Sequence, residues 1–323
     1  MKILYIYRDY KGRRKKYGEM MSSCGHDVNY LEILEKKQKN QVSSEIIKKY
    51  NPELLWIYSH YYISYKVIPE KTLEYVKKRN IPIVLYGTTG PDVPYMDILD
   101  VWKQIDFLFV HNQHFCSFLK TKGLNAYYMP LGFYPDQYYK KISKKKYDVS
   151  FMGTSQTKDI KKYDKRAEYL KFLDHYNIAI YGESFKNKVN KIPVYSYKGH
   201  EIQREIYSKT KINLDLPFPC SKNKIHEFYK NQIHIKNRFF EIPATGNFLL
   251  TVRCPEFLDI FPEDTVGYYD DNTDSLKENV DKYLKDKNLR KKMSEKAYKL
   301  VHEKHTYLHR FKDMFKIINE EKC

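Results

Sequence analysis

Arg238 and Glu241 offer the clearest chemistry in this chain of 323 residues. The sequence predicts a short helix over 237–244, and residues three apart lie on the same face of a helix. A guanidinium can bind phosphate, and a carboxylate can accept hydrogen bonds from ribose hydroxyls, so the pair fits a nucleotide. The same two residues would also make an ordinary ion pair on a helix surface. Their types and spacing leave both interpretations open.

The residues that follow must position this helix. Thr245 and Gly246 predict its end, because glycine readily adopts the left-handed conformation that caps helices. The apolar run 248–250 is typical of a parallel strand covered on both faces. Helix and strand together would form one unit of a parallel α/β sheet.

Strands and helices alternate along most of the chain. In the first half we expect strands at 2–7, 26–31, 54–58, 81–86, 107–110 and 126–129, with helices at 13–24, 43–50 and 68–79 and a further helix that follows the strand 107–110 and ends at 122. In the second half we expect strands at 148–152, 178–181, 212–216, 248–250 and 266–269, and helices at 164–175, 201–208, 237–244, 274–285 and 289–302. This alternation predicts doubly wound parallel sheets of the Rossmann type, and the length favours two such α/β domains. A cleft between the carboxyl ends of the two sheets would be the place for a ligand.

Composition limits the compartment and the partners. There are 58 basic and 40 acidic residues, a net charge of +18, which favours an anionic partner such as a phospholipid surface, a nucleic acid or a phosphorylated acceptor. A Lys-, Tyr- and Asn-rich composition is also typical of an AT-rich genome. The five cysteines are scattered, so they indicate neither a disulfide framework nor a zinc site, and they fit the reducing cytoplasm. We find no signal peptide and no apolar run of about 20 residues, so any membrane contact should be peripheral.

Several stretches, in order, resemble a known family. They include DVSFMGTS, AIYGESF, YSKTKINLDL, NRFFEIPATGNFLLT and HTYLHRF, within residues 147–315. Together they are similar to the CgeB-like (spore-maturation) branch of nucleotide-sugar glycosyltransferases, which have the two-domain GT-B fold. A more distant resemblance is to the phage DNA glucosyltransferases, which share the glycine loop, the arginine after it and an Arg-x-x-Glu helix.

The resemblance implies a division of the chain. It implies an N-terminal Rossmann-like acceptor domain over 1–135, a linker over 136–146 and a Rossmann-like nucleotide-sugar domain over 147–302. Residues 303–323 would form a C-terminal helix that crosses back to the first domain. The two domains would face each other across a cleft.

The resemblance also implies a donor-binding loop made by Gly153, Thr154 and Ser155. Backbone N–H groups of this loop would approach the diphosphate, and the N-terminus of the next helix would add a favourable field. The alternative is an ordinary turn between a strand and a helix.

Three side chains would complete the donor site. Arg166 would neutralise the leaving diphosphate, Arg238 would be a second cation there, and Glu241 would accept the ribose hydroxyls. For Arg166 the alternative is a solvated charge among neighbouring lysines. Arginine is scarce among the basic residues here, however, and its planar fork suits a diphosphate better than lysine does.

The expected chemistry is stabilisation of the leaving group by preformed cations and N–H donors, with no metal site and no cofactor beyond a nucleotide-sugar donor, most simply a UDP-sugar. Retaining relatives carry a second glutamate where this chain has Ile233, which favours an inverting reaction. Glu227 is close in the sequence, however, so retention stays open as the alternative. An inverting enzyme needs a base, and Asp92 is our candidate because the DNA glucosyltransferases place theirs in a similar context. Asp92 also fits a common Gly-Pro turn.

We therefore expect a cytoplasmic glycosyltransferase, with peripheral contact at the inner membrane face as an option. Its acceptor would be an anionic or lipid-linked glycan, a protein or DNA, and the sequence leaves the oligomeric state open. The first alternative is a phage-type enzyme that glucosylates modified bases in DNA, which the positive charge favours. The others are a sugar-nucleotide epimerase on the same fold and a binding module without activity.

Overall fold

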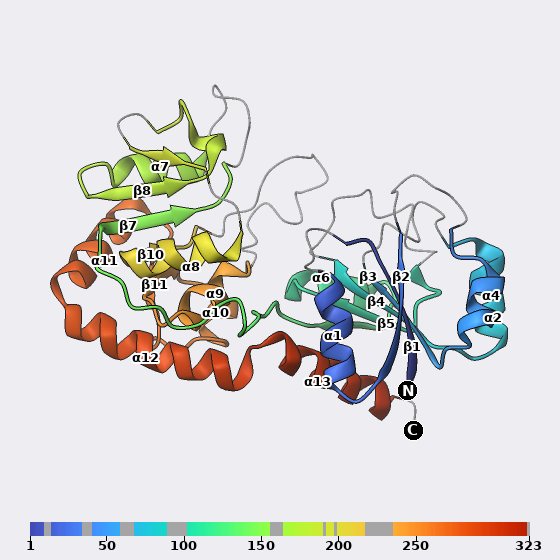
Figure 1. Ribbon diagram of the computed structural model, residues 1–323. Helices are drawn as coiled ribbons and strands as arrows, with labels where there is room; N and C mark the ends of the chain where they lie inside the picture. Colours follow the sequence, from blue (N-terminus) through green and yellow to red (C-terminus); the bar gives the residue numbers. More distant parts are fainter. Residues whose placement is uncertain are drawn as a thin grey trace. The chain divides into compact units, whose positions relative to one another are not determined.

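The computed structural model describes residues 1–9, 14–33, 41–58, 68–88, 102–155, 164–189, 192–196, 199–216 and 235–321. By its internal contacts the chain divides into two compact units (Figure 1). Unit 1 comprises Met1–Pro130 and Tyr307–Cys323, and unit 2 comprises Leu131–Thr306. Among the described residues, no helix combines the length and the apolar character needed to cross a bilayer.

Unit 1 contains a parallel sheet with the strand order β2-β1-β3-β4-β5-β6. The strands are β1 (Lys2–Tyr7), β2 (Asp27–Glu32), β3 (Leu54–Tyr58), β4 (Ile83–Thr88), β5 (Phe107–Val110) and β6 (Ala126–Tyr128). The helices are α1 (Lys15–Ser23), α2 (Ser44–Tyr50), α4 (Glu70–Lys78), α6 (Gln113–Thr121) and α13 (Tyr307–Glu320). The central strands are almost wholly apolar and buried, as expected for parallel strands covered on both faces.

Helix α13 belongs to the core of unit 1, although it lies far away in the sequence. It packs against α1, as Figure 1 shows. Its Phe311 is fully buried, with ring centroids 5.5 Å from Trp56, 5.7 Å from Tyr86 and 5.7 Å from Tyr17. The amphipathic pattern of this segment thus buries an aromatic stripe against the first unit.

Unit 2 contains a second parallel sheet, with the order β12-β11-β10-β7-β8-β9. The strands are β7 (Tyr147–Met152), β8 (Ile178–Tyr181), β9 (Val194–Tyr195), β10 (Thr210–Leu214), β11 (Leu249–Val252) and β12 (Gly267–Tyr269). The helices are α7 (Lys165–Phe172), α8 (His200–Lys209), α9 (Arg238–Ala244), α10 (Pro255–Leu258), α11 (Thr273–Lys285) and α12 (Lys287–Lys304), with a 3₁₀ turn η2 at Glu183–Phe185.

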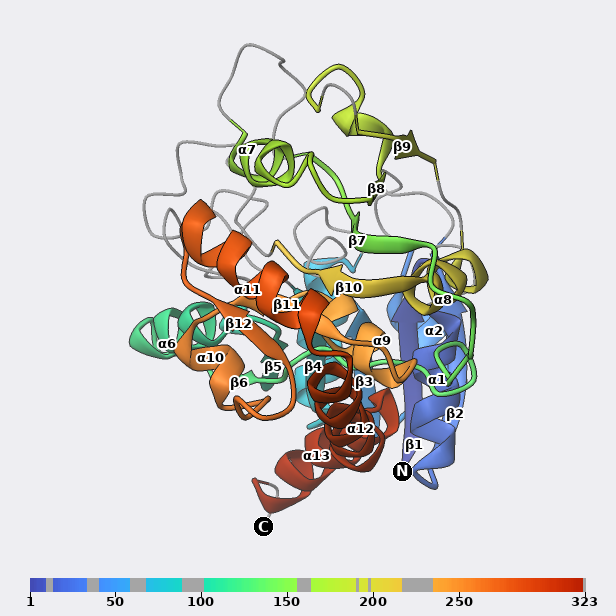
Figure 2. The ribbon, with the colours of Figure 1, turned by 90° about the vertical axis from the view of Figure 1, so that its left-hand side faces the viewer.

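The strand order of unit 2 reverses between β7 and β10. From β7 the chain proceeds to β8 on one side, and from β10 it proceeds to β11 on the other, an arrangement visible in Figure 2. In open α/β sheets such a switch point leaves a crevice outside the carboxyl ends of the two strands, where ligands bind. The fold therefore predicts that a ligand of unit 2 binds outside the carboxyl ends of β7 and β10.

The predicted fold class, two doubly wound parallel sheets, is confirmed. Three short elements, β9, η2 and α10, were not predicted, because elements of two to four residues are too short to show a period. Residues before β7 pack onto unit 2, since Leu131, Phe133 and Tyr138 belong to its hydrophobic core.

Candidate active site

The candidate site lies at the switch point of unit 2. Gly153 follows β7, and Asp215 follows β10. Phe151 of β7 and Leu214 of β10 are paired in register, so the two chain segments leave the sheet at the same edge. The amide of Asp215 also donates to the carbonyl of Leu250 at 2.9 Å, which extends the pairing with β11 to this residue.

The loop after β7 is held by close backbone contacts. The N–H of Gly153 donates to the carbonyl of Tyr181 at 3.0 Å. A Cβ atom at Gly182 would lie 1.9 Å from the carbonyl oxygen of Gly153, so no larger residue fits there without displacing the loop. The glycine at 182 is thus required by the approach of the loop.

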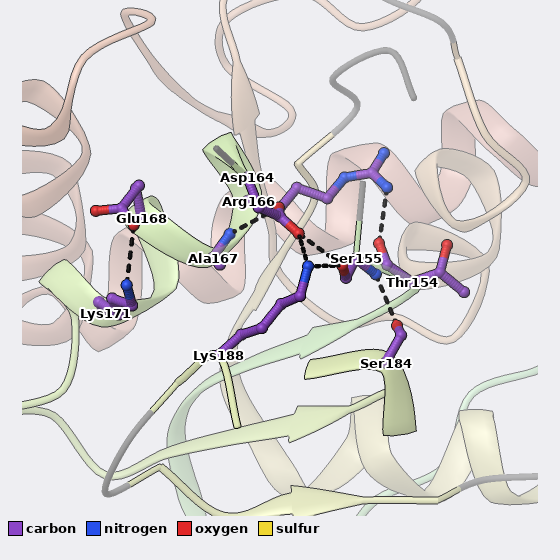
Figure 3. Close-up of polar contacts among 9 residues, drawn as sticks. All are labelled: Thr154, Ser155, Asp164, Arg166, Ala167, Glu168, Lys171, Ser184 and Lys188. Atoms are coloured by element: carbon purple, nitrogen blue, oxygen red, sulfur yellow. Dashed lines mark hydrogen bonds and ion pairs between the residues drawn. The ribbon is translucent and has the colours of Figure 1, made fainter. Parts of the chain in front are cut away.

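Ser155 is fixed by a buried polar cluster (Figure 3). Its N–H donates to the Oγ of Ser184 at 2.8 Å, and its hydroxyl donates to the Oδ2 of Asp164 at 2.6 Å. The ammonium of Lys188 donates to the Oγ of Ser155 at 2.8 Å and to the Oδ2 of Asp164 at 3.1 Å. The Lys188 and Asp164 side chains are only 5 % and 4 % exposed, so this is a buried ion pair.

Asp164 also caps helix α7. Its Oδ1 accepts a hydrogen bond from the amide of Ala167 at 3.1 Å, in the usual N-cap geometry. Burial by itself raises the pKa of this carboxyl, but the hydrogen bonds from Ser155 and Ala167 and the charge of Lys188 outweigh it. The pKa of Asp164 therefore lies below its usual value.

These bonds determine which loop amides remain available. Gly153 and Ser155 already donate their N–H groups within the protein. In the described part of the chain the N–H of Thr154 has no such partner, and Thr154 is exposed. Of the three amides expected to approach a diphosphate, only that of Thr154 is in a position to donate to it in this conformation.

Arg166 is buried beside the loop. Its Nε donates to the carbonyl of Leu216 at 2.8 Å, and its Nη1 donates to the carbonyl of Thr154 at 2.9 Å, the second bond appearing in Figure 3. The arginine thus joins the segment after β7 to the segment after β10. It is not the solvated helix charge that the sequence allowed.

Arg238 lies close to Gly153. Its Nη1 donates to the Oδ1 of Asp215 at 3.3 Å, and its guanidinium lies 5.4 Å from the ring centroid of Phe151. A Cβ at Gly153 would lie 3.0 and 3.1 Å from the two terminal nitrogens of Arg238, so the glycine makes room for them. The side chain of Arg238 is 17 % exposed, so a ligand outside the sheet edge can reach it.

Glu241 is buried one helical turn after Arg238 in α9. The structure therefore gathers Gly153, Thr154, Arg166 and Arg238 at the switch point, with Glu241 on the same short helix as Arg238. The hydroxyl of Ser155 is turned to the buried cluster instead. Asp92 and Ile233 lie outside the described residues.

Sequence reasoning missed three residues of this site: Asp164, Lys188 and Asp215. Asp164 stands three positions before Ala167 at the start of a helix, so its role as a cap was readable from the sequence. Asp215 interrupts the apolar end of a predicted strand, a weak signal for a functional carboxylate. Lys188 has no local signal, because its partners are defined only by the fold. Among the described residues, no three His, Cys, Asp or Glu side chains gather as a metal ion would require.

Comparisons with known proteins agree with this architecture. Residues 165–316 match the family described as glycosyl transferase-like. The chain resembles sucrose-phosphate synthase from Thermosynechococcus elongatus at 10 % identity, with 98 % of each chain covered and a TM-score of 0.67. No match was found among curated protein sequences.

Two further solved structures are similar over nearly their whole length. One is an α-glucosyltransferase in complex with UDP and a 13-mer DNA containing an HMU base, at 14 % identity, with 98 % of this chain and 99 % of that chain covered and a TM-score of 0.69. The other is HepE from Anabaena in complex with UDP-glucose, at 8 % identity, with 99 % and 100 % covered and a TM-score of 0.64. With its two parallel sheets the chain has the GT-B fold of these solved structures, and residues 165–316 within it match the glycosyl transferase-like family.

Proposed function

We propose that this chain, as a member of the CgeB-like branch, transfers a sugar from a UDP-sugar to a hydroxyl acceptor. The observation that carries this proposal is the pair of arginines anchored at the switch point of unit 2, one of them accessible from outside. The UDP complexes of two proteins with the same fold support UDP as the nucleotide.

In this proposal the donor diphosphate lies against Arg238 and the amide of Thr154. The guanidinium is held beside Gly153, so it needs little reorganisation when an anion arrives. Arg166 is buried beside the loop 153–155, so it adds positive charge although its guanidinium is not exposed to solvent. Glu241 would accept hydrogen bonds from the ribose hydroxyls.

The same groups would stabilise the leaving nucleotide. When the bond between sugar and phosphate breaks, negative charge accumulates on the diphosphate, and preorganised donors stabilise that charge best. We propose that the cations and the loop amide do this without a metal ion. Activity that survives complete chelation would support this part of the proposal, and loss of activity that Mg²⁺ or Mn²⁺ restores would refute it.

The stereochemical proposal is inversion with Asp92 as the base. It depends on the sequence resemblance and on Ile233 replacing the second glutamate of retaining relatives. NMR of the first-formed product tests it, since the anomeric configuration must be opposite to that of the donor. Retention would contradict it, and Asp92→Asn should abolish transfer while leaving donor binding unchanged.

A DNA acceptor is the second candidate, with a lipid-linked glycan or a protein as the other acceptor classes. The net charge of +18 favours DNA, as does the similarity to an α-glucosyltransferase solved with DNA. A duplex containing hydroxymethylated pyrimidines, incubated with radiolabelled UDP-glucose, tests this option directly. Absence of label together with absence of duplex binding at low salt would remove DNA as the acceptor.

Donor binding is tested by calorimetric titration of UDP-, GDP-, dTDP- and CMP-glucose. We expect UDP-glucose to bind, and Arg238→Ala to weaken it roughly tenfold to hundredfold, since a hydrogen bond to a charged group contributes about 1.5–3 kcal/mol. Arg253→Ala is the matched control, because Arg253 is a more exposed arginine of the same unit, paired with Glu263 and Asp270. Equal affinities of the two variants would refute the site, and no binding of any donor would refute the function.

A further inference from the structure

Asp215 carries a buried charge that is only half satisfied. It is fully buried at the end of β10. Its Oδ1 accepts a single hydrogen bond from Arg238, and its Oδ2 has no hydrogen-bond partner in the described structure. A buried carboxylate oxygen without a partner is costly, and a residue chosen for stability alone would be apolar here.

The position of Asp215 suits a role in orienting the two candidate arginines. Its side chain holds Arg238, and the carbonyl of the next residue, Leu216, holds Arg166. Two consecutive residues after β10 thus anchor both candidate diphosphate cations. A shift of this segment would move both guanidinium groups.

The contact between Asp215 and Arg238 leaves the arginine available. At 3.3 Å it is longer than the roughly 2.7–2.9 Å of a tight charge-assisted bond, and it uses one nitrogen. A guanidinium has five N–H donors, and this is the single hydrogen bond that the described residues give to Arg238. The carboxylate therefore fixes the direction of the side chain and leaves its outer N–H groups for a ligand.

Unpaired polar atoms gather at this part of unit 2. Thr251 on β11 and Tyr269 on β12, the next two strands, also have buried hydroxyl groups without a partner in the described structure. Unsatisfied groups in a native fold tend to occur where function opposes stability. Burial raises the pKa of Asp215, against the nearby charges of Arg238, Arg166 and Lys236, which agrees with a carboxylate held there at a cost.

We propose that Asp215 is a positioning residue, which acts through Arg238 to hold its guanidinium where the donor diphosphate binds. The inference rests on the proposed function, because the diphosphate is taken as the ligand of Arg238. It adds that Asp215 serves donor binding and lowers the stability of unit 2.

Two substitutions at Asp215 distinguish the effect of its hydrogen-bond acceptor from the effect of its negative charge. Asp215→Ala removes the acceptor and should weaken UDP binding about tenfold, the effect of losing one charge-assisted bond. Asp215→Asn keeps an oxygen for Arg238 and should stay within about threefold of the unmodified protein. Both variants should unfold at or above the temperature of the unmodified protein, because each removes a buried, half-paired charge. The control is Asp270→Ala, which removes an exposed acidic residue of the same unit and should leave UDP binding unchanged.

A double-mutant cycle tests the action through Arg238. In an Arg238→Ala background, Asp215→Ala should change UDP affinity by less than about twofold, since the group through which it acts is gone. An equal loss in both backgrounds would overturn the inference, as would tighter UDP binding by Asp215→Ala, which would make the carboxylate a competitor of the diphosphate. If Asp215→Ala does not fold, a loss of UDP affinity by Asp215→Asn as large as that of Arg238→Ala would equally overturn it.

The two proposals can fail separately. If the unmodified protein binds no nucleotide, the proposed function fails. If it binds UDP and Arg238→Ala abolishes binding while Asp215→Ala binds normally, the donor site stands and the role of Asp215 is refuted.

Discussion

Replacing Lys188 by methionine should destabilise unit 2 strongly, because it removes the cation buried against Asp164. The ammonium and the carboxylate are 3.1 Å apart, with side chains only 5 % and 4 % exposed. Methionine has nearly the same length without the charge, so the carboxylate would stay buried alone. Breaking a buried pair in this way costs about 3–5 kcal/mol, which for a unit of this size lowers the unfolding midpoint by about 10 °C.

Lys171→Met is the matched control, on helix α7, the helix that Asp164 caps. Figure 3 draws the contact between Lys171 and Glu168, which are 2.9 Å apart, slightly closer than the buried pair. Both of these side chains are 47 % exposed. Exposed pairs contribute about 0–1 kcal/mol, so the midpoint should fall by no more than about 3 °C. Scanning calorimetry gives the unfolding midpoints of both variants. Because the two ion pairs have nearly the same distance between nitrogen and oxygen, a difference between the midpoints reports the effect of burial.

The dependence on pH supplies a second measurement. The lowered pKa of Asp164 means that its pairing stabilises the fold above about pH 4, and that this contribution is lost as the pH falls through the folded-state pKa. The difference in unfolding midpoint between the unmodified protein and Lys188→Met should therefore become smaller at acid pH. Adding Asp164→Asn to Lys188→Met should restore part of the stability, since asparagine still caps a helix. Equal midpoints for Lys188→Met and Lys171→Met would refute the reasoning.

Two further predictions concern packing. Gly182→Ala should lower the stability of unit 2 by about 1–3 kcal/mol and weaken UDP binding, because the new Cβ would lie 1.9 Å from the carbonyl oxygen of Gly153. Chemical denaturation and UDP titration check this, and unchanged UDP affinity would argue against the loop as part of the donor site. Phe311→Ala should cost unit 1 about 3–5 kcal/mol, since the ring is fully buried against Trp56 and Tyr86. A denaturation midpoint that does not move would show that α13 contributes little to that core.

The strands were the part of the fold most easily predicted. The ranges 2–7, 54–58, 107–110 and 178–181 agree with the structure to the residue, because each is a mainly apolar run. Helix ends differ by a few residues, since capping depends on local hydrogen bonds. The sequence therefore sufficed for the fold class and for most elements.

The candidate site was predictable only in part. The resemblance identified Gly153, Arg166 and Arg238, which the structure brings together. The partners of these groups came from the fold, since Asp215 is 23 residues from Arg238 and Lys188 is 24 from Asp164. A local pattern carries no information on contacts of that range. For the same reason the sequence did not show that two of the three loop amides are already engaged.

The division of unit 1 into two stretches has a consequence for biosynthesis. Helix α13 leaves the ribosome only after the whole of unit 2 has been made. Until then the aromatic side chains that will receive Phe311, among them Trp56 and Tyr86, lack their covering helix. The nascent protein thus carries an uncovered apolar surface while unit 2, which is contiguous, is free to fold first. A premature stop codon within α13 would consequently destabilise unit 1, most of which is translated first. The apolar surface left exposed for chaperones would then lie in the N-terminal part of the chain, although the truncation is at the C-terminus.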